Sequence, residues 1–259
     1  MYTLYVIPGS HACRSGILML QHKRVPYRRV DIPTLLHPLA VRMAGFEASP
    51  ERRTAGTRRP SPLRFGDRFG TVPALAARDH RVSSNRAIAR FLDDRHPEPA
   101  LFPANSRQRQ AVEEAERWAN DTLQMAARRL TLAGVRGGDL SRISHSGSDG
   151  RMGYLLYRTV VARRLIIPMI GRFAFAVGEG TDAKLQAKLP AMLDRIDAWI
   201  ADGVLGGPQL NAADFMVAPS LALMLYRTDI QPLFEGRPAL ELVDRILPEP
   251  AVETAGVEA

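Results

Sequence analysis

Cysteine is almost absent from this chain of 259 residues, which contains a single one, Cys13. One thiol cannot form an internal disulfide, so nothing in the sequence indicates an oxidising compartment. A metal site built on paired cysteines is excluded for the same reason. None of the six histidines belongs to an H-x-x-x-H or H-E-x-x-H pair, so we expect no metal site of any kind.

Long apolar runs are also missing. The most apolar stretch of the later sequence, LIIPMIG at residues 165–171, is far shorter than the ~20 apolar residues that a bilayer span needs. The N-terminus, MYTLYVIPGS, has neither the basic region nor the long apolar region of a signal peptide. We therefore expect a cytoplasmic protein with no membrane partner.

Glycine-rich phosphate-binding loops do not occur either, and we expect no tightly bound cofactor. The net charge of +8 raises the question of nucleic-acid binding. However, the basic residues are mostly scattered arginines and form no basic stripe interleaved with aromatic residues, so we expect no nucleic-acid partner. A hydrophobic content of 46% and a charged content of 24% are instead typical of a folded chain of one or two domains.

The first hundred residues carry alternating strand and helix patterns. TLYVI at residues 3–7 predicts a buried strand, CRSGILMLQH at 13–22 a helix with Ser10 as its N-cap, and YRRVDI at 27–32 a second, parallel strand. A short helix at 38–46, an exposed loop at 47–62, two short strands between 70 and 84 and a helix at 85–94 follow. The predicted domain, residues 1–95, has the order β-α-β-α-β-β-α.

The rest of the chain reads as helix. Proline-rich residues 96–104 predict a linker, and apolar residues at helical spacing predict an all-helical domain over 105–247. Pro168 predicts a break in a helix over 152–175. Asn211, with Asp214 three residues later, resembles a capping box, which gives Asp214 a structural role. Residues 248–259 predict a disordered tail.

Four stretches, in this order, resemble the cytosolic glutathione S-transferase superfamily, which joins a thioredoxin-like domain to a helical bundle. LYVIPGSHACRSGILMLQHKRVPYRRVDI is similar to that family's first strand, active-site turn and first helix. GTVPAL at 70–75 matches its Val-Pro before the third strand, NRAIARFLDDRHPEPALFP its next helix and linker, and LNAADFMVAPSL the start of a core helix. The resemblance implies this two-domain fold.

The resemblance also implies a site for a small thiol. Ser10 falls on the first active-site position and would donate a hydrogen bond to a thiolate, with a simple N-cap as the alternative. Val72 would pair through its backbone with the cysteinyl part of a peptide, beside a cis bond to Pro73. Ser84 and Asn85 stand where the family has an acidic or amide residue and a serine. They would either hold a carboxylate or merely cap the helix.

Further candidate residues have open alternatives. Cys13 corresponds to the fourth position of the Cys-x-x-Cys pattern, where it would either react or pack as a small buried residue. His11 would polarise or bind a ligand, or be an exposed loop histidine. Residues that would line a pocket for the acceptor, although core packing explains them equally well, are Met125, Arg128, Tyr154 and Tyr157.

The sequence therefore predicts an enzyme similar to glutathione S-transferases. It would add a low-molecular-weight thiol, either glutathione or another cellular thiol, to a hydrophobic electrophile. One alternative is a thiol-dependent reductase in which Cys13 forms a mixed disulfide. Another is a non-catalytic binding or assembly module that keeps the fold and has lost the site. A homodimer is expected from the resemblance alone.

Overall fold

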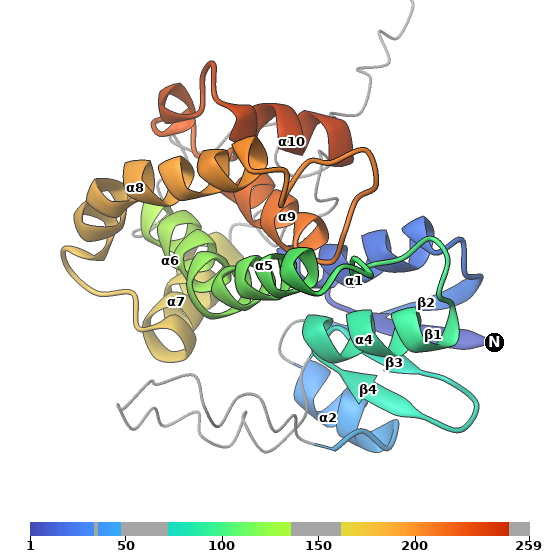
Figure 1. The fold of residues 1–259 in the computed structure, drawn as a ribbon. Helices are drawn as coiled ribbons and strands as arrows, with labels where there is room; N and C mark the ends of the chain where they lie inside the picture. Colours follow the sequence, from blue (N-terminus) through green and yellow to red (C-terminus); the bar gives the residue numbers. More distant parts are fainter. Residues whose placement is uncertain (34–35, 48–71, 136–161, 249–259) are drawn as a thin grey trace, which may run out of the picture.

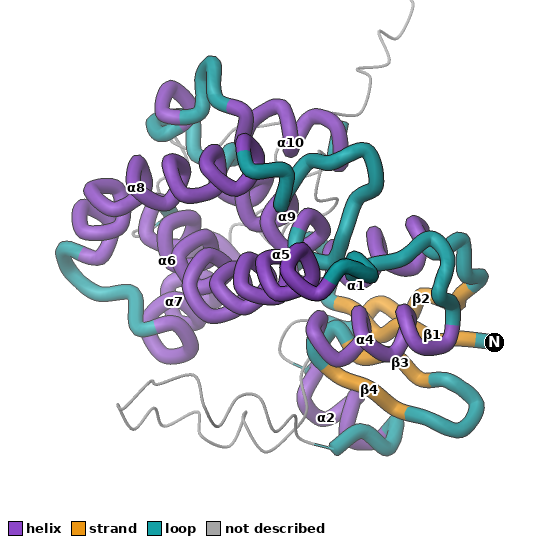
Figure 2. Tube along the Cα trace, in the orientation of Figure 1, coloured by secondary structure: helices purple, strands orange, loops and turns teal. Residues whose placement is uncertain are grey.

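The computed structural model describes residues 1–33, 36–47, 72–135 and 162–248. Its first part is a four-stranded mixed sheet, β1 (Tyr2–Val6), β2 (Tyr27–Asp31), β3 (Ala74–Ala76) and β4 (Arg81–Ser83), in the order β2-β1-β3-β4. Helices α1 (His11–His22), α2 (His37–Met43) and α4 (Asn85–Arg95) connect and cover it. Figure 1 and Figure 2 show these strands gathered at one end of the molecule, with helices making up the rest.

The pairing of the strands brings several chain segments to one edge of the sheet. β1 and β2 run parallel, whereas β3 is antiparallel to β1, with Tyr5 opposite Ala74. β4 is antiparallel to β3, with Ser83 also opposite Ala74. The end of β1, the start of β3 and the end of β4 therefore lie at the same edge. Both α1 and α4 begin there, so two helix N-termini face this edge.

The second part of the described chain is helical. A nearly continuous helical run contains α5 (Ser106–Trp118), a π-helical turn η2 (Ala119–Leu123) and α6 (Gln124–Gly134). After the gap, a π-helical turn η6 (Ala162–Ile166) leads into α7 (Ile167–Phe175). The remaining elements are α8 (Thr181–Ala201), α9 (Asp214–Met224), the 3-10 turn η7 (Gln231–Leu233) and α10 (Pro238–Ile246).

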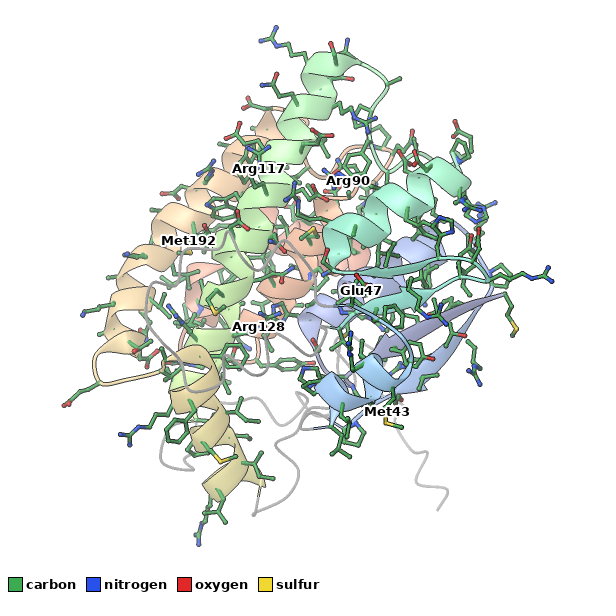
Figure 3. All side chains as sticks on the ribbon, turned by 90° about the horizontal axis from the view of Figure 1, so that it is seen from below. Met43, Glu47, Arg90, Arg117, Arg128 and Met192 are labelled. Carbon is green, nitrogen blue, oxygen red and sulfur yellow. The ribbon has the colours of Figure 1, made fainter. Side chains whose placement is uncertain are left out.

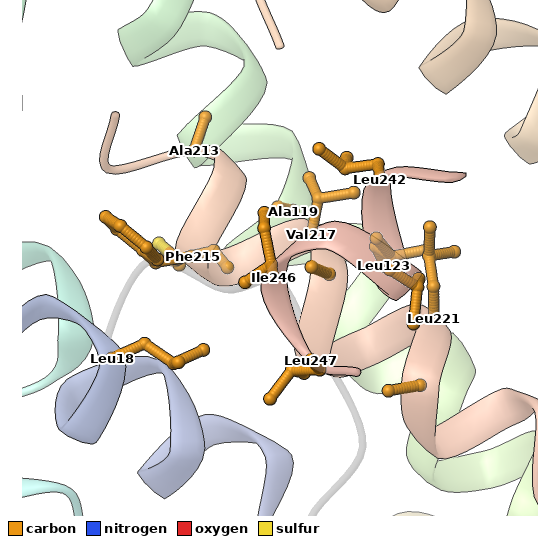
Figure 4. Packing of buried hydrophobic residues seen from close by; sticks show 14 of the residues in the cluster. Leu18, Ala119, Leu123, Ala213, Phe215, Val217, Leu221, Leu242, Ile246 and Leu247 are labelled. Atoms are coloured by element: carbon orange, nitrogen blue, oxygen red, sulfur yellow. The ribbon is translucent and has the colours of Figure 1, made fainter. Parts of the chain in front are cut away.

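One core joins the two parts. Leu18 of α1 is buried and belongs to the same hydrophobic cluster as Phe215 of α9, Leu123 of η2 and Ile246 of α10. Figure 4 shows these side chains where α1 meets the helical part. α9 is buried along its whole length, which agrees with its apolar sequence on every side. The position of α1 against the helical part is therefore fixed by packing.

The predicted fold class, an α/β thioredoxin-like domain followed by helices, is confirmed. Each predicted strand and helix of the first hundred residues is present, with bounds that differ by a few residues. Pro168 occupies the first turn of α7, directly after the π-helical turn, so the predicted interruption lies just before this proline. The predicted loop at 47–62 and the predicted tail at 248–259 lie largely outside the described residues.

Candidate active site

Ser10 is the N-cap of α1. Its backbone is extended, and its Oγ accepts a hydrogen bond from the N–H of Cys13 at 3.4 Å. A hydroxyl oxygen can accept such a bond and still donate its own hydrogen elsewhere. The cap and the proposed donation to a thiolate are therefore compatible. The positive end of the α1 dipole adds to the attraction that this position exerts on an anion.

Cys13 lies one turn into α1 and is only 1% exposed. Its sulfur accepts a hydrogen bond from the N–H of Ile7 at 3.3 Å. Burial raises the pKa of the Cys13 thiol, and the hydrogen bonds to Ile7 and Ser10 only partly oppose this. Because the thiolate is the reactive form, this environment favours the packing role of Cys13 over the reactive one.

His11 is in the first turn of α1 and is buried, so the reading of an exposed loop histidine is wrong. Packing of this turn against the helical part encloses it. Burial and the positive charge of Arg128 lower the pKa of His11 well below its ordinary value, although a hydrogen bond to the backbone of Gln124 opposes them. The imidazole is therefore neutral near pH 7, and its Nε2 has no hydrogen-bond partner among the described residues.

The Val72–Pro73 peptide bond is cis, which is the isomer that the resemblance implies. Pro73 packs closely on α1, because a Cβ added to Gly16 would lie 3.2 Å from the Cβ of Pro73. The same added atom would lie 3.7 Å from Oδ1 of Asn85. α1, the start of β3 and the start of α4 thus approach one another around Gly16, and Val72 stands at the edge where Ser10 caps α1.

Ser84 caps α4, accepting a hydrogen bond from the N–H of Ala87 at 3.3 Å. Its backbone has a φ of 82°, a left-handed value that is uncommon outside glycine. The N–H of Ser84 donates to the carbonyl of Pro73 at 3.2 Å, which links this turn to β3. Asn85 is 97% buried, and its Oδ1 has no hydrogen-bond partner among the described residues. The capping role of Ser84 is thus realised.

The acceptor side is described only in part. Met125 and Arg128 are half-buried residues of α6, and Arg128 acts electrostatically on both His11 and Cys13. Figure 3 labels Arg128 on the helix that faces the sheet domain. Tyr154 and Tyr157 lie outside the described residues. Among the pocket candidates, Arg128 is therefore the one that the structure places close to the N-terminus of α1.

Two residues near the site were not anticipated. Gln124, at the junction of η2 and α6, is buried and meets His11 through its backbone. No local sequence pattern predicts this contact, because it depends on how α1 packs against α6, which is distant in the sequence. Gly16 did have a signal, because an isolated glycine within a helical pattern often marks a close approach.

Within the described ranges, no group of three histidine, cysteine, aspartate or glutamate side chains could hold a metal ion. No helix of the described chain is long and apolar enough to cross a membrane.

Comparison with known proteins agrees with this geometry. Residues 4–100 match the family model described as the glutathione S-transferase N-terminal domain. No curated protein sequence is significantly similar to the chain.

Solved structures with the same fold include the following three. A glutathione S-transferase from Rhodospirillum rubrum is 21% identical, with a TM-score of 0.60 over 95% of this chain and 87% of that one. A Ceriporiopsis subvermispora glutathione S-transferase in complex with glutathione is 15% identical, with a TM-score of 0.63 over 95% and 96%. The third is a maleylacetoacetate isomerase from Anaeromyxobacter dehalogenans with bound dicarboxyethyl glutathione. It is 19% identical, with a TM-score of 0.51 over 95% and 85%. Residues 4–100 thus match the glutathione S-transferase N-terminal domain, and the chain as a whole has the fold of solved glutathione S-transferases.

Proposed function

We propose that the protein is a glutathione S-transferase-like enzyme that adds a low-molecular-weight thiol, glutathione or another cellular thiol, to a hydrophobic electrophile. The observation that carries this proposal is the convergence at one sheet edge. The Ser10 cap of α1, the backbone of Val72 and the start of α4 all lie at that edge. In this arrangement Ser10 would contact the sulfur of a small thiol peptide, Val72 its backbone and the start of α4 its carboxylate.

Ser10 would act on the sulfur. Its hydroxyl would donate a hydrogen bond to the thiolate while its oxygen keeps the cap bond to Cys13. The α1 dipole favours the same negative charge, so both effects lower the free energy of the thiolate relative to the thiol. The sulfur lone pair would then form the new bond to the electrophilic carbon. The displaced group would leave with the bonding electrons, or a proton would be added where the acceptor is a double bond.

Val72 and the start of α4 would hold the rest of the thiol. Backbone pairing with Val72 does not depend on side chains, so it survives the changes elsewhere in the site. The free N–H groups at the start of α4, with Ser84 and Asn85, suit a carboxylate. Neither residue is acidic, and an α-amino group would therefore lack a charged partner here. This is why the identity of the thiol is left open between glutathione and another cellular thiol.

We propose that Arg128 and Met125 line the pocket for the electrophilic acceptor. Tyr154 and Tyr157 remain predictions from the sequence for the same pocket. His11 is neutral and would contribute shape and a hydrogen-bonding nitrogen rather than charge. Dimerisation and a cytoplasmic location also stay predictions.

The test is transfer of glutathione and other thiols to a chloronitroaromatic electrophile by three variants of Ser10. Ser10→Ala removes both the cap and the donor, and we expect kcat/KM to fall about ten- to hundredfold, as for loss of a hydrogen bond to a charged group. Ser10→Thr keeps both, and we expect it to retain most activity. Ser10→Asp keeps the cap but cannot donate, so it should fold normally and be inactive. Equal rates for the wild type and Ser10→Ala would remove Ser10 from the mechanism.

One observation favours a second candidate, a non-catalytic binding module. At Ser84 the chain has a hydroxyl where the family resemblance implies an acidic or amide residue for peptide binding. Isothermal titration calorimetry with glutathione and related thiols separates the two. Heat of binding supports the enzyme, whereas no binding of any thiol, together with no transfer, supports the module.

A further inference from the structure

The helix α7 exposes an apolar stripe. Leu165 of η6, Met169 and Phe173 follow one another at intervals of four residues, which sets them on one face of the helix. Their exposed fractions are 68%, 45% and 49%. The opposite face, which includes Ile167 and Gly171, is buried against the helical part. Three neighbouring large apolar side chains on one exposed helix face form a patch rather than a scattered background.

The charged residues in the helical segment that carries this stripe have one sign. Residues 162–175 contain three arginines and no acidic residue. Arg164 and Arg172 are exposed, and Arg129 of α6 donates from its Nε to the carbonyl of Phe175 at the end of α7. The nearest carboxylate in the following sequence is Glu179, in the turn that leads to α8. The apolar stripe is therefore bordered by cations.

A second exposed apolar group lies on α2. Leu36, Leu39 and Met43 are spaced as neighbours on one helix face and are 56%, 57% and 80% exposed. The other face of α2 is anchored by Val41, which packs in a small core with Phe46. Figure 1 shows both α2 and α7 on the lower side of the molecule.

We propose that this side, formed by the exposed side chains of α7 and α2, docks onto the surface of an anionic lipid bilayer. Leucine, methionine and phenylalanine would enter the boundary between headgroups and acyl chains, while the arginines contact lipid phosphates. The inference goes beyond the proposed function and does not depend on it. It concerns attachment at the surface and not a membrane span, and it revises the expectation of no membrane partner.

The charge pattern decides between this occupant and others. A second copy on the same face would set arginines against arginines, with no acidic residue of α7 to pair with them. Nucleic acid would satisfy the arginines and leave the exposed leucine and methionine side chains in water. An anionic bilayer satisfies both, because it offers negative headgroups and an apolar interior at adjacent depths.

Co-sedimentation of the full chain with vesicles tests the proposal. One set contains phosphatidylcholine alone, and the other contains phosphatidylcholine and phosphatidylglycerol in equal amounts. We expect binding to the anionic set only, with a loss on adding salt, since each arginine near the surface contributes about fivefold at low ionic strength. The variant Leu165→Ser/Met169→Ser should lose at least tenfold in partitioning, because it removes two large apolar groups.

The control is Leu233→Ser, which changes a leucine of η7 that is 37% exposed and belongs to neither α7 nor α2. It should sediment like the wild type, and circular dichroism should show both variants folded. The proposal is overturned if the wild type stays in the supernatant with anionic vesicles, or if the double variant sediments as well as the wild type does. A change from dimer to monomer on introducing Leu165→Ser/Met169→Ser, seen by analytical ultracentrifugation, would assign the stripe to a second copy instead.

Discussion

At the scale of single residues, Cys13 gives the clearest separation between hypotheses. As the only cysteine, it is the only group that a thiol reagent can label. Its burial and raised pKa predict slow labelling of the native protein and rapid labelling in denaturant. A mixed-disulfide mechanism requires the reverse, a thiol that reacts in the folded state.

We therefore expect Cys13→Ala to retain thiol transfer within about twofold, and to lower the free energy of unfolding by about 1–2 kcal/mol through lost packing. Cys13→Ser is the matched variant, since its hydroxyl still accepts from the N–H of Ile7. Kinetics with the chloronitroaromatic electrophile and urea unfolding measure the two quantities. Loss of activity in both variants, with their folding intact, would restore the reductase hypothesis.

The residue scale is also where sequence reasoning reached its limit. Ser10 was recognisable as a cap because capping depends on a few neighbouring residues. The burial of His11 could not be predicted from neighbouring residues, because it is enclosed by α6, which lies more than a hundred residues later in the chain. The reactive or inert character of Cys13 likewise depends on what covers it, and sequence alone left both readings open.

At the scale of elements, the start of α9 is a reciprocal cap. Oδ2 of Asp214 accepts from the N–H of Asn211 at 2.8 Å, and Oδ1 of Asn211 accepts from the N–H of Ala213 at 2.9 Å. A third bond runs from the N–H of Gly206 to Oδ1 of Asp214 at 2.8 Å. The capping box that the sequence pattern indicates is thus formed, with a loop tied into it.

Burial raises the pKa of Asp214 to about 6, despite the hydrogen bonds from Asn211 and Gly206. A folded-state pKa above the unfolded value means that the folded protein binds the proton more tightly, so stability falls as pH rises through this range. The contribution of Asp214 is largest below pH 3.8 and is lost above about pH 6.

Asp214→Asn removes this titration. The unfolding free energy of the wild type minus that of Asp214→Asn should therefore decrease by about 3 kcal/mol as the pH rises through that window. Urea unfolding followed by circular dichroism at several pH values measures this difference. A difference that does not change with pH would mean that the carboxylate is ionised throughout, and that its two N–H donors outweigh burial.

At the scale of the whole molecule, local patterns predicted the elements and their order, because helix and strand periodicity depends on neighbours in the sequence. The resemblance supplied how they assemble. The contacts that join the two parts were not predictable. Glu116 of α5 meets Arg86 and Arg90 of α4, which lie 30 and 26 residues earlier, and no sequence pattern pairs them.

These ion pairs join α5 of the helical part to α4. The Glu116 side chain is fully buried and accepts from Arg86 Nε at 3.2 Å and from both terminal nitrogens of Arg90 at 2.8 and 2.9 Å. α4 begins at Asn85, directly before Arg86, so the pair fixes the helix whose first turn would hold the carboxylate of the thiol. Removing the Glu116 carboxylate should therefore weaken thiol binding and also lower the free energy of unfolding.

Glu116→Ala should lower the free energy of unfolding by about 1–2 kcal/mol, less than for a fully buried pair, because both arginines are partly exposed and can turn to water. It should also weaken thiol binding. Glu114→Ala is the matched control, since that α5 carboxylate is 59% exposed and pairs with Arg195 of α8. Calorimetry and urea unfolding of both variants test the coupling. If Glu116→Ala destabilises the protein while thiol affinity stays equal to that of Glu114→Ala, the pair is a structural link that does not reach the site.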